Sequence, residues 1–160
     1  GELQDLLAAD NQAPLVNLVL LPGKQANTDE FVAGQASPIG FVLRDGDPGK
    51  LPQVRDGQMR IQDQGSQLSA LLLSRARPAA PGELWLDLCA GPGGKAALLS
   101  HICDVSGRDF VANEISEPRA KLVKNVIGKY GVIVGDGREI ASHGETFDEK
   151  LMIVRCQLNK

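Results

Sequence analysis

The residues best suited to chemistry are a glycine-rich turn and three carboxylates, each of which lies at or near the carboxyl end of a predicted strand. The glycine turn spans residues 87–95 and runs from a predicted strand straight into a predicted helix. Its glycines matter because a side chain there would block a ligand from the backbone amides at the start of the helix. This pattern predicts a site for a nucleotide-like ligand, with candidate contacts from Asp87, Cys89, Ala90, Gly91, Pro92, Gly93, Gly94 and Lys95.

Two classes of nucleotide-like ligand fit this turn. The letters GPGGKA, residues 91–96, match the looser dinucleotide pattern G-x-G-x-x-A, and Glu114 follows about twenty residues later. A NAD(P)- or flavin-dependent oxidoreductase is therefore one interpretation. A phosphate-binding Walker loop is excluded, because Cys89 replaces its first glycine and Ala96 replaces the Ser or Thr that holds magnesium.

Charge favours the other class, which is S-adenosylmethionine. Asp87 directly precedes the turn, where it would repel a pyrophosphate but attract the ammonium and sulfonium groups of that methyl donor. Lys95 would pair with Asp87 or contact the donor's carboxylate, and Glu114 would accept hydrogen bonds from the ribose. Asp136 would accept from the adenine amino group. Acids at three successive strand ends thus predict S-adenosylmethionine as the cofactor.

The elements that must hold these residues alternate along the second half of the chain. A helix with apolar residues at helical spacing is predicted first, over residues 65–76. Strands and helices then follow in turn over residues 84–89, 93–103, 109–115, 117–128 and 130–137. Strands separated by helices of this length predict a parallel sheet with right-handed crossovers, which is an α/β fold of Rossmann type.

The first part of the chain predicts a small α+β segment instead. It contains a helical stretch at 2–10, a strand at 14–22, a short helix at 28–33 and a strand at 41–43. Turn-forming residues make 44–58 the expected linker. We therefore divide the chain into an N-terminal segment, residues 1–52, and a Rossmann-like domain, residues 53–160.

Composition narrows the setting of the protein. A chain of 160 residues with 42% hydrophobic and 23% charged residues predicts a folded globular protein. The net charge of -3 gives no overall attraction to nucleic acid, so any RNA must bind a local basic patch. Three widely spaced cysteines argue against a zinc cluster or a disulfide framework. Without a recognisable signal peptide or membrane span, we expect a cytoplasmic protein.

Five stretches together resemble a known family. In chain order they are QDQGSQLSALLL, WLDLCAGPGGKAALL, VANEISEPRAKLV, VGDGRE and FD, within residues 56–148. They are similar to the Sun or Fmu type of bacterial ribosomal RNA cytosine-5 methyltransferases, related to eukaryotic nucleolar enzymes. The resemblance implies S-adenosylmethionine as methyl donor, ribosomal RNA as partner and an RNA-contacting module in residues 1–52. It also adds Arg119 to the donor site, although Arg119 could equally belong to a basic or merely solvated helix face.

The resemblance implies two cysteines in catalysis, one attacking C6 of cytosine and one helping to release the product. Cys156 aligns with the cysteine of the family's Asp-x-Pro-Cys motif, but Ile153 and Arg155 replace its Asp and Pro. The nucleophilic cysteine comes from a later Thr-Cys motif, which is not reached before Lys160. We therefore expect an incomplete catalytic domain that binds the donor but transfers no methyl group.

Three explanations of this ending stay open: a truncated or frame-shifted product, a sequence that omits stretches of a longer protein, or a short relative that binds the donor without methylating. A noncatalytic RNA-binding relative is a separate alternative function. A half-sheet with an exposed edge would also favour association between copies of the chain.

Overall fold

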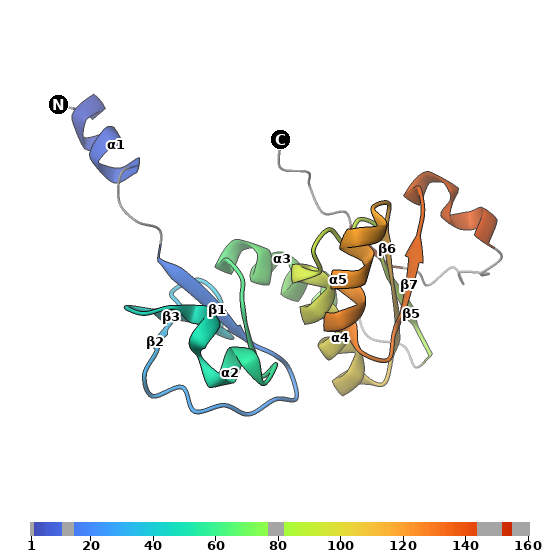
Figure 1. Cartoon of the computed structure of the whole chain (residues 1–160), viewed down its shortest axis with the longest axis horizontal. Coiled ribbons are helices and arrows are strands. Elements are labelled where there is room, and N and C mark those ends of the chain that lie inside the picture. Colours follow the sequence, from blue (N-terminus) through green and yellow to red (C-terminus); the bar gives the residue numbers. More distant parts are fainter. Residues whose placement is uncertain (1, 11–14, 77–81, 144–151, 155–160) are drawn as a thin grey trace.

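The computed structural model describes residues 2–10, 15–76, 82–143 and 152–154 and contains two four-stranded sheets (Figure 1). The strand order is β2-β3-β1-β4 in the first sheet and β7-β6-β5-β8 in the second. Helix α1 (Glu2–Asp10) precedes both sheets and extends away from the rest of the chain in Figure 1.

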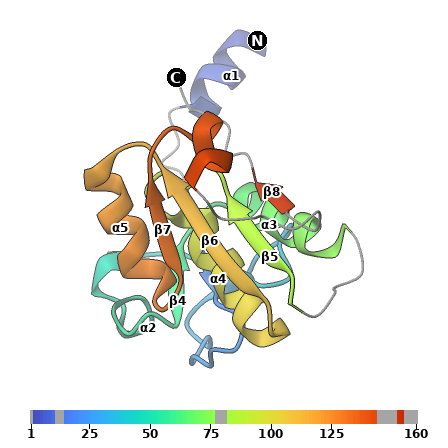
Figure 2. The ribbon, with the colours of Figure 1, turned by 90° about the vertical axis from the view of Figure 1, so that its right-hand side faces the viewer.

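The second sheet is parallel, as the alternation of strands and helices predicts. Its central strands are β5 (Leu84–Asp87) and β6 (Asp109–Glu114), flanked by β7 (Gly131–Val134) and β8 (Met152–Val154). The connecting helices are α4 (Gly94–Ser106) and α5 (Glu117–Ile127). Figure 2 shows the four strands side by side in front of α4. The predicted Rossmann-like arrangement is thus confirmed.

The first sheet is antiparallel. Its central strand β1 (Val16–Leu20) pairs with β3 (Gly40–Leu43) on one side and with β4 (Met59–Ile61) on the other. The two-residue strand β2 (Val32–Ala33) forms the far edge. Leu18, Phe31, Leu43 and Met59 are buried together on one face, which α2 (Pro52–Arg55) covers.

Three sequence predictions about this first part are wrong. The short helix expected at 28–33 is absent, because β-branched Val32 pairs with Val42 of β3 instead. The linker expected at 44–58 contains the 3₁₀ helix η1 (Pro48–Lys50) and α2. Strand β4 then returns to the first sheet, so the division into domains that we propose falls after Ile61 rather than at residue 52.

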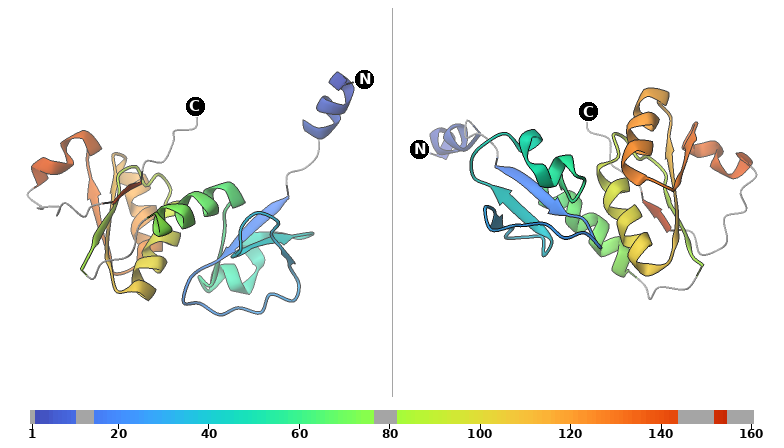
Figure 3. Two further views of the ribbon diagram at one scale, coloured as in Figure 1. Left: turned by 180° about the vertical axis from the view of Figure 1, so that it is seen from behind. Right: turned by 60° about the horizontal axis from the view of Figure 1, so that its bottom comes forward.

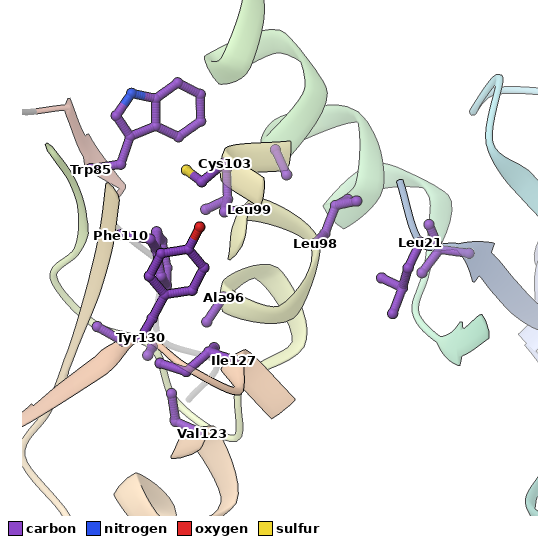
Figure 4. Close-up of a cluster of buried hydrophobic side chains, with 14 residues drawn as sticks. Leu21, Trp85, Ala96, Leu98, Leu99, Cys103, Phe110, Val123, Ile127 and Tyr130 are labelled. Atoms are coloured by element: carbon purple, nitrogen blue, oxygen red, sulfur yellow. The ribbon is translucent and has the colours of Figure 1, made fainter. Parts of the chain in front are cut away.

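Helix α3 (Gln64–Arg75) joins the two sheets, and Figure 3 shows it running from one to the other. The amide of Gln67, which is fully buried, donates to Leu18 O of β1 at 3.1 Å. In addition, Val19 of β1 and the neighbouring Leu21 belong to the same buried cluster as Trp85 of β5 and Leu98 of α4 (Figure 4). The two sheets therefore share a continuous apolar core.

Gly93 fixes how closely α5 approaches the start of α4. Its φ of 92° lies in the left-handed region, and a Cβ there would come within 2.7 Å of Val126 Cγ2 and 3.3 Å of Val123 Cα. Both the backbone conformation and the packing thus require glycine.

Gly93→Ala should lower the free energy of unfolding by about 3 kcal/mol, because a left-handed backbone and overpacking each cost a non-glycine residue stability. Gly57→Ala is the matched control, since Gly57 also has a positive φ of 67° but no atom within 4 Å of the added Cβ. It should lose only about 1 kcal/mol. Urea denaturation measures both values, and equal losses would show that the contact with α5 is unimportant.

Candidate functional site

The parallel sheet brings the three predicted carboxylates to one edge. Asp87 is the last residue of β5, Glu114 is the last residue of neighbouring β6, and Asp136 lies two residues beyond the end of β7. Because β5, β6 and β7 are adjacent and parallel, their carboxyl ends lie side by side. In open α/β sheets this edge is where ligands bind.

Asp87 is fully buried, and its carboxylate is only half satisfied. Its Oδ1 accepts a hydrogen bond from Cys89 N at 3.3 Å, whereas Oδ2 is buried without a hydrogen-bond partner. Burial raises the pKa of Asp87 to about 7, an effect that Cys89 N and Lys95 oppose and Glu114 reinforces. A buried, unpartnered carboxylate oxygen is suited to a cationic ligand.

This pKa makes the stability of the fold depend on pH. The pKa of Asp87 in the folded state lies above the unfolded value of 3.8. Its stabilising contribution to the free energy of unfolding is therefore fully present below pH 3.8 and is lost as pH rises through about 7. Between pH 5 and pH 8 the wild type should lose about 2–3 kcal/mol of unfolding free energy relative to Asp87→Asn. Urea denaturation at both pH values measures this difference, and parallel pH profiles would contradict it.

Glu114 connects the glycine turn to the start of α5. Its carboxylate is 4% exposed and accepts from Gly91 N through Oε2 and from Ser116 N through Oε1, both at 2.9 Å. Arg119 donates to Oε1 from Nε at 2.9 Å and forms an ion pair at 2.6 Å. A carboxylate oxygen can accept two hydrogen bonds, so Oε2 can still accept one from a ligand hydroxyl.

The glycine turn leaves room for a ligand. Gly91 has a φ of 57°, and a Cβ built at Gly91 or Gly94 would meet no atom within 4 Å. A backbone hydrogen bond fixes the turn to β6, because Ala90 N donates to Asn113 O at 2.9 Å. The space above Gly91 and Gly94 is therefore open to a ligand that contacts the turn amides.

Lys95 lies in the first turn of α4 and reaches α3. Its Nζ donates to Ser66 Oγ at 3.3 Å, and its charge also lowers the pKa of Asp63. Asp63 caps α3 by accepting from Ser66 N at 2.7 Å. Lys95 thus contacts α3 through Ser66, and its charge also acts on Asp87.

Asp136 lies in the loop that begins at Gly135 after β7 and leads into the 3₁₀ helix η2 (Gly137–His143). Its carboxylate accepts from Arg138 N at 2.9 Å and from Arg138 Nε at 3.0 Å. These hydrogen bonds hold the pKa of Asp136 down at about 2. Asp136 is therefore an ionised acceptor at the third strand end, and Arg138 is a neighbour that sequence reasoning did not single out.

The two cysteines within the described residues differ in accessibility. Cys89 of the glycine turn is exposed, whereas Cys103 of α4 is fully buried in the core, and burial raises the pKa of its thiol to about 12. Cys156, the candidate catalytic residue, lies outside the described residues.

Asn113 is a buried site residue that sequence reasoning missed. Its side chain is 2% exposed and donates from Nδ2 to Leu88 O at 3.0 Å and to Gly135 O at 3.2 Å. A single amide group therefore contacts the loops that follow β5 and β7. An asparagine beside a functional acid was the available signal, but only the fold shows what it contacts.

The model of a family described as 16S rRNA methyltransferase RsmB/F matches residues 76–159. The match covers more than half of the chain and includes every strand of the parallel sheet. The chain belongs to the RsmB/F family. Membership in RsmB/F confirms the resemblance seen in the sequence and does not favour the oxidoreductase interpretation.

Individual relatives of this RsmB/F chain agree with the family match. A Mycobacterium tuberculosis protein provisionally named a methyltransferase is 44% identical over 128 residues, 77% of this chain and 28% of that protein. Ribosomal RNA small subunit methyltransferase B of Vibrio vulnificus is 35% identical over 83% of this chain and 31% of its own length. The 5-cytosine rRNA methyltransferase NSUN4 of Bos taurus is 32% identical over 75% of this chain and 34% of its own. The RsmB/F chain thus spans about a third or less of these relatives.

A solved structure supports the fold of this RsmB/F chain. The crystal structure of PH0851 superposes with a TM-score of 0.74 at 20% identity, over 95% of this chain and 37% of that one. The superposition includes the N-terminal sheet as well as the parallel sheet. Among the helices that the structure describes, none is both long and apolar enough to cross a lipid bilayer.

Proposed function

We propose that this chain binds S-adenosylmethionine and forms part of a methyltransferase that acts on C5 of cytosine in ribosomal RNA. The observation that carries the proposal is the buried Asp87 carboxylate, whose Oδ2 has no hydrogen-bond partner beside the open glycine turn. Family membership and the names of the relatives support the reaction and the RNA substrate.

Each strand end would hold one part of the donor. Asp87 would bind the cationic methionine part, and Lys95 would contact its carboxylate. Glu114, which Arg119 and Gly91 N hold in place, would accept from a ribose hydroxyl through Oε2. Asp136 would accept from the adenine amino group. When bound, the donor supplies the methyl group, while these residues orient it and keep its charge compensated.

The N-terminal sheet is our candidate for RNA contact. A cavity of about 450 Å³ lies against the sheet face opposite α2 and is lined by Leu15, Val32, Val42, Arg44 and Gln64 among others. Apolar walls with amide and guanidinium groups at the rim suit an unstacked base and its phosphate. Gln64 begins α3, the helix whose Ser66 contacts Lys95. RNA bound here would therefore lie one helical turn from a residue of the donor site.

Two further parts of the proposal concern partners and location. Strand β7 is an edge of the parallel sheet as described, and Val134 on it is 48% exposed, so a second copy of the chain is a candidate partner there. A ribosomal RNA substrate would place the protein in the cytoplasm.

Isothermal titration calorimetry with S-adenosylmethionine, NAD and FAD tests the donor assignment. We expect heat of binding from S-adenosylmethionine and none from NAD or FAD. Binding of NAD or FAD with no binding of the methyl donor would overturn the proposal in favour of an oxidoreductase. Retention of ribosomal RNA on the chain without donor binding would indicate a noncatalytic RNA-binding relative.

A further inference from the structure

We propose that Asn113 is a positioning residue that sets the spacing between the two loops holding opposite ends of the methyl donor. This inference rests on the proposed function. The two loops are the glycine turn after β5 and the loop that begins at Gly135 after β7.

The first observation is the pair of hydrogen bonds from one amide group. Asn113 Nδ2 donates one proton to Leu88 O at 3.0 Å and the other to Gly135 O at 3.2 Å. Both acceptors are backbone carbonyls, so each bond fixes a loop rather than a mobile side chain. The backbone of Asn113 adds a third bond, because its carbonyl accepts from Ala90 N at 2.9 Å. Asn113 thus holds the turn at two points and the β7 loop at one.

The second observation is independent and comes from the facing loop. A Cβ on Gly137 would lie 3.0 Å from Leu88 Cδ1 and 3.2 Å from Leu88 O. The β7 loop therefore packs directly on the same Leu88 whose carbonyl Asn113 contacts. Its backbone approaches so closely that a Cβ on Gly137 would require Leu88 to shift by a few tenths of an ångström.

These contacts bear on the donor because its two ends belong to different loops. The turn carries Asp87 and Gly91, which face the methionine and ribose parts, while the β7 loop carries Asp136 for the adenine. A ligand that spans both loops is sensitive to their separation, since misplaced groups lose hydrogen bonds at one end. A change in loop spacing should therefore weaken donor affinity without removing any group that contacts the donor.

Asn113→Asp is the direct test, because a carboxylate of the same shape replaces two donated protons with an oxygen that faces two carbonyl oxygens. Gly137→Ala alters the same spacing from the opposite loop. With S-adenosylhomocysteine as the probe, calorimetry on the full 160-residue chain should give at least about tenfold weaker binding for each variant. Circular dichroism first establishes a temperature at which every variant is folded.

A matched control separates positioning from general stability. Leu43→Ala removes a buried side chain of the N-terminal sheet, 7% exposed, and should lower the melting temperature while leaving the S-adenosylhomocysteine affinity within twofold of wild type. Wild-type affinity in both Asn113→Asp and Gly137→Ala would overturn the inference, as would an equal loss in Leu43→Ala. If the wild type itself binds no S-adenosylhomocysteine, the proposed function fails instead.

Discussion

The Asp87→Asn variant is expected to bind S-adenosylmethionine about a hundredfold more weakly than the wild type at pH 8, while its fold becomes more stable. The loss follows because a buried carboxylate with a free oxygen is replaced by a neutral amide, which cannot compensate the charge of the donor. The gain follows because the same carboxylate is costly to bury when nothing pairs with Oδ2. Opposite effects on binding and stability distinguish a ligand-binding acid from a structural one.

Calorimetry at pH 6 and pH 8 adds a second check on Asp87. Since its pKa is about 7 without ligand, wild-type affinity should rise with pH over this range, and that rise should be absent in Asp87→Asn. Asp109→Asn makes the same change in net charge at the exposed opposite end of β6 and should bind like the wild type. An equal loss of affinity in Asp109→Asn would mean that overall charge, not Asp87, governs binding.

Glu114→Ala is expected to impair both the fold and the donor site. Truncation leaves Gly91 N and Ser116 N without their acceptor and Arg119 without its partner. Losing a buried acceptor with several donors should lower the unfolding free energy by about 3 kcal/mol. Donor affinity should fall more than tenfold even where the variant is folded, because the ribose acceptor is lost and the glycine turn is no longer held by Gly91.

Urea denaturation and calorimetry measure these two effects of Glu114. Glu117→Ala is the matched control, because Glu117 pairs with Lys121 at the surface, with side chains 70% and 73% exposed. Such a pair contributes little, so stability and donor affinity should both stay close to wild type. A Glu114→Ala variant as stable as Glu117→Ala would mean that water replaces the Glu114 hydrogen bonds without cost.

The parallel sheet was predictable because its signals are local. Each strand is a short apolar run, each crossover helix follows at once, and the glycine turn marks where β5 meets α4. The first sheet was harder, since β4 pairs with β1, about forty residues earlier in the chain, and only three residues carry its pattern. Val32 was misjudged for the same reason, because its strand exists only through pairing with β3.

The site residues also divide into those that local sequence signals reveal and those whose contacts only the fold reveals. Asp87, Glu114 and Asp136 were predictable because each carboxylate lies at or just beyond the carboxyl end of a strand and all three strands run the same way. The contacts of Asn113 were not, because its acceptors at Leu88 and Gly135 are backbone carbonyls, which leave no trace in residue types. The partner of Arg119 was likewise invisible until α5 was placed over the end of β6.

The packing of Val19 and Leu21 into the core of the parallel sheet has a practical consequence for anyone who wishes to trim the protein. A fragment that started after Ile61 would retain every strand around the glycine turn. It would also expose to water the apolar surface of α3 and of the buried cluster against which Val19 and Leu21 now pack. Such a fragment should self-associate or precipitate, so the smallest soluble unit that keeps the donor site begins before Val16.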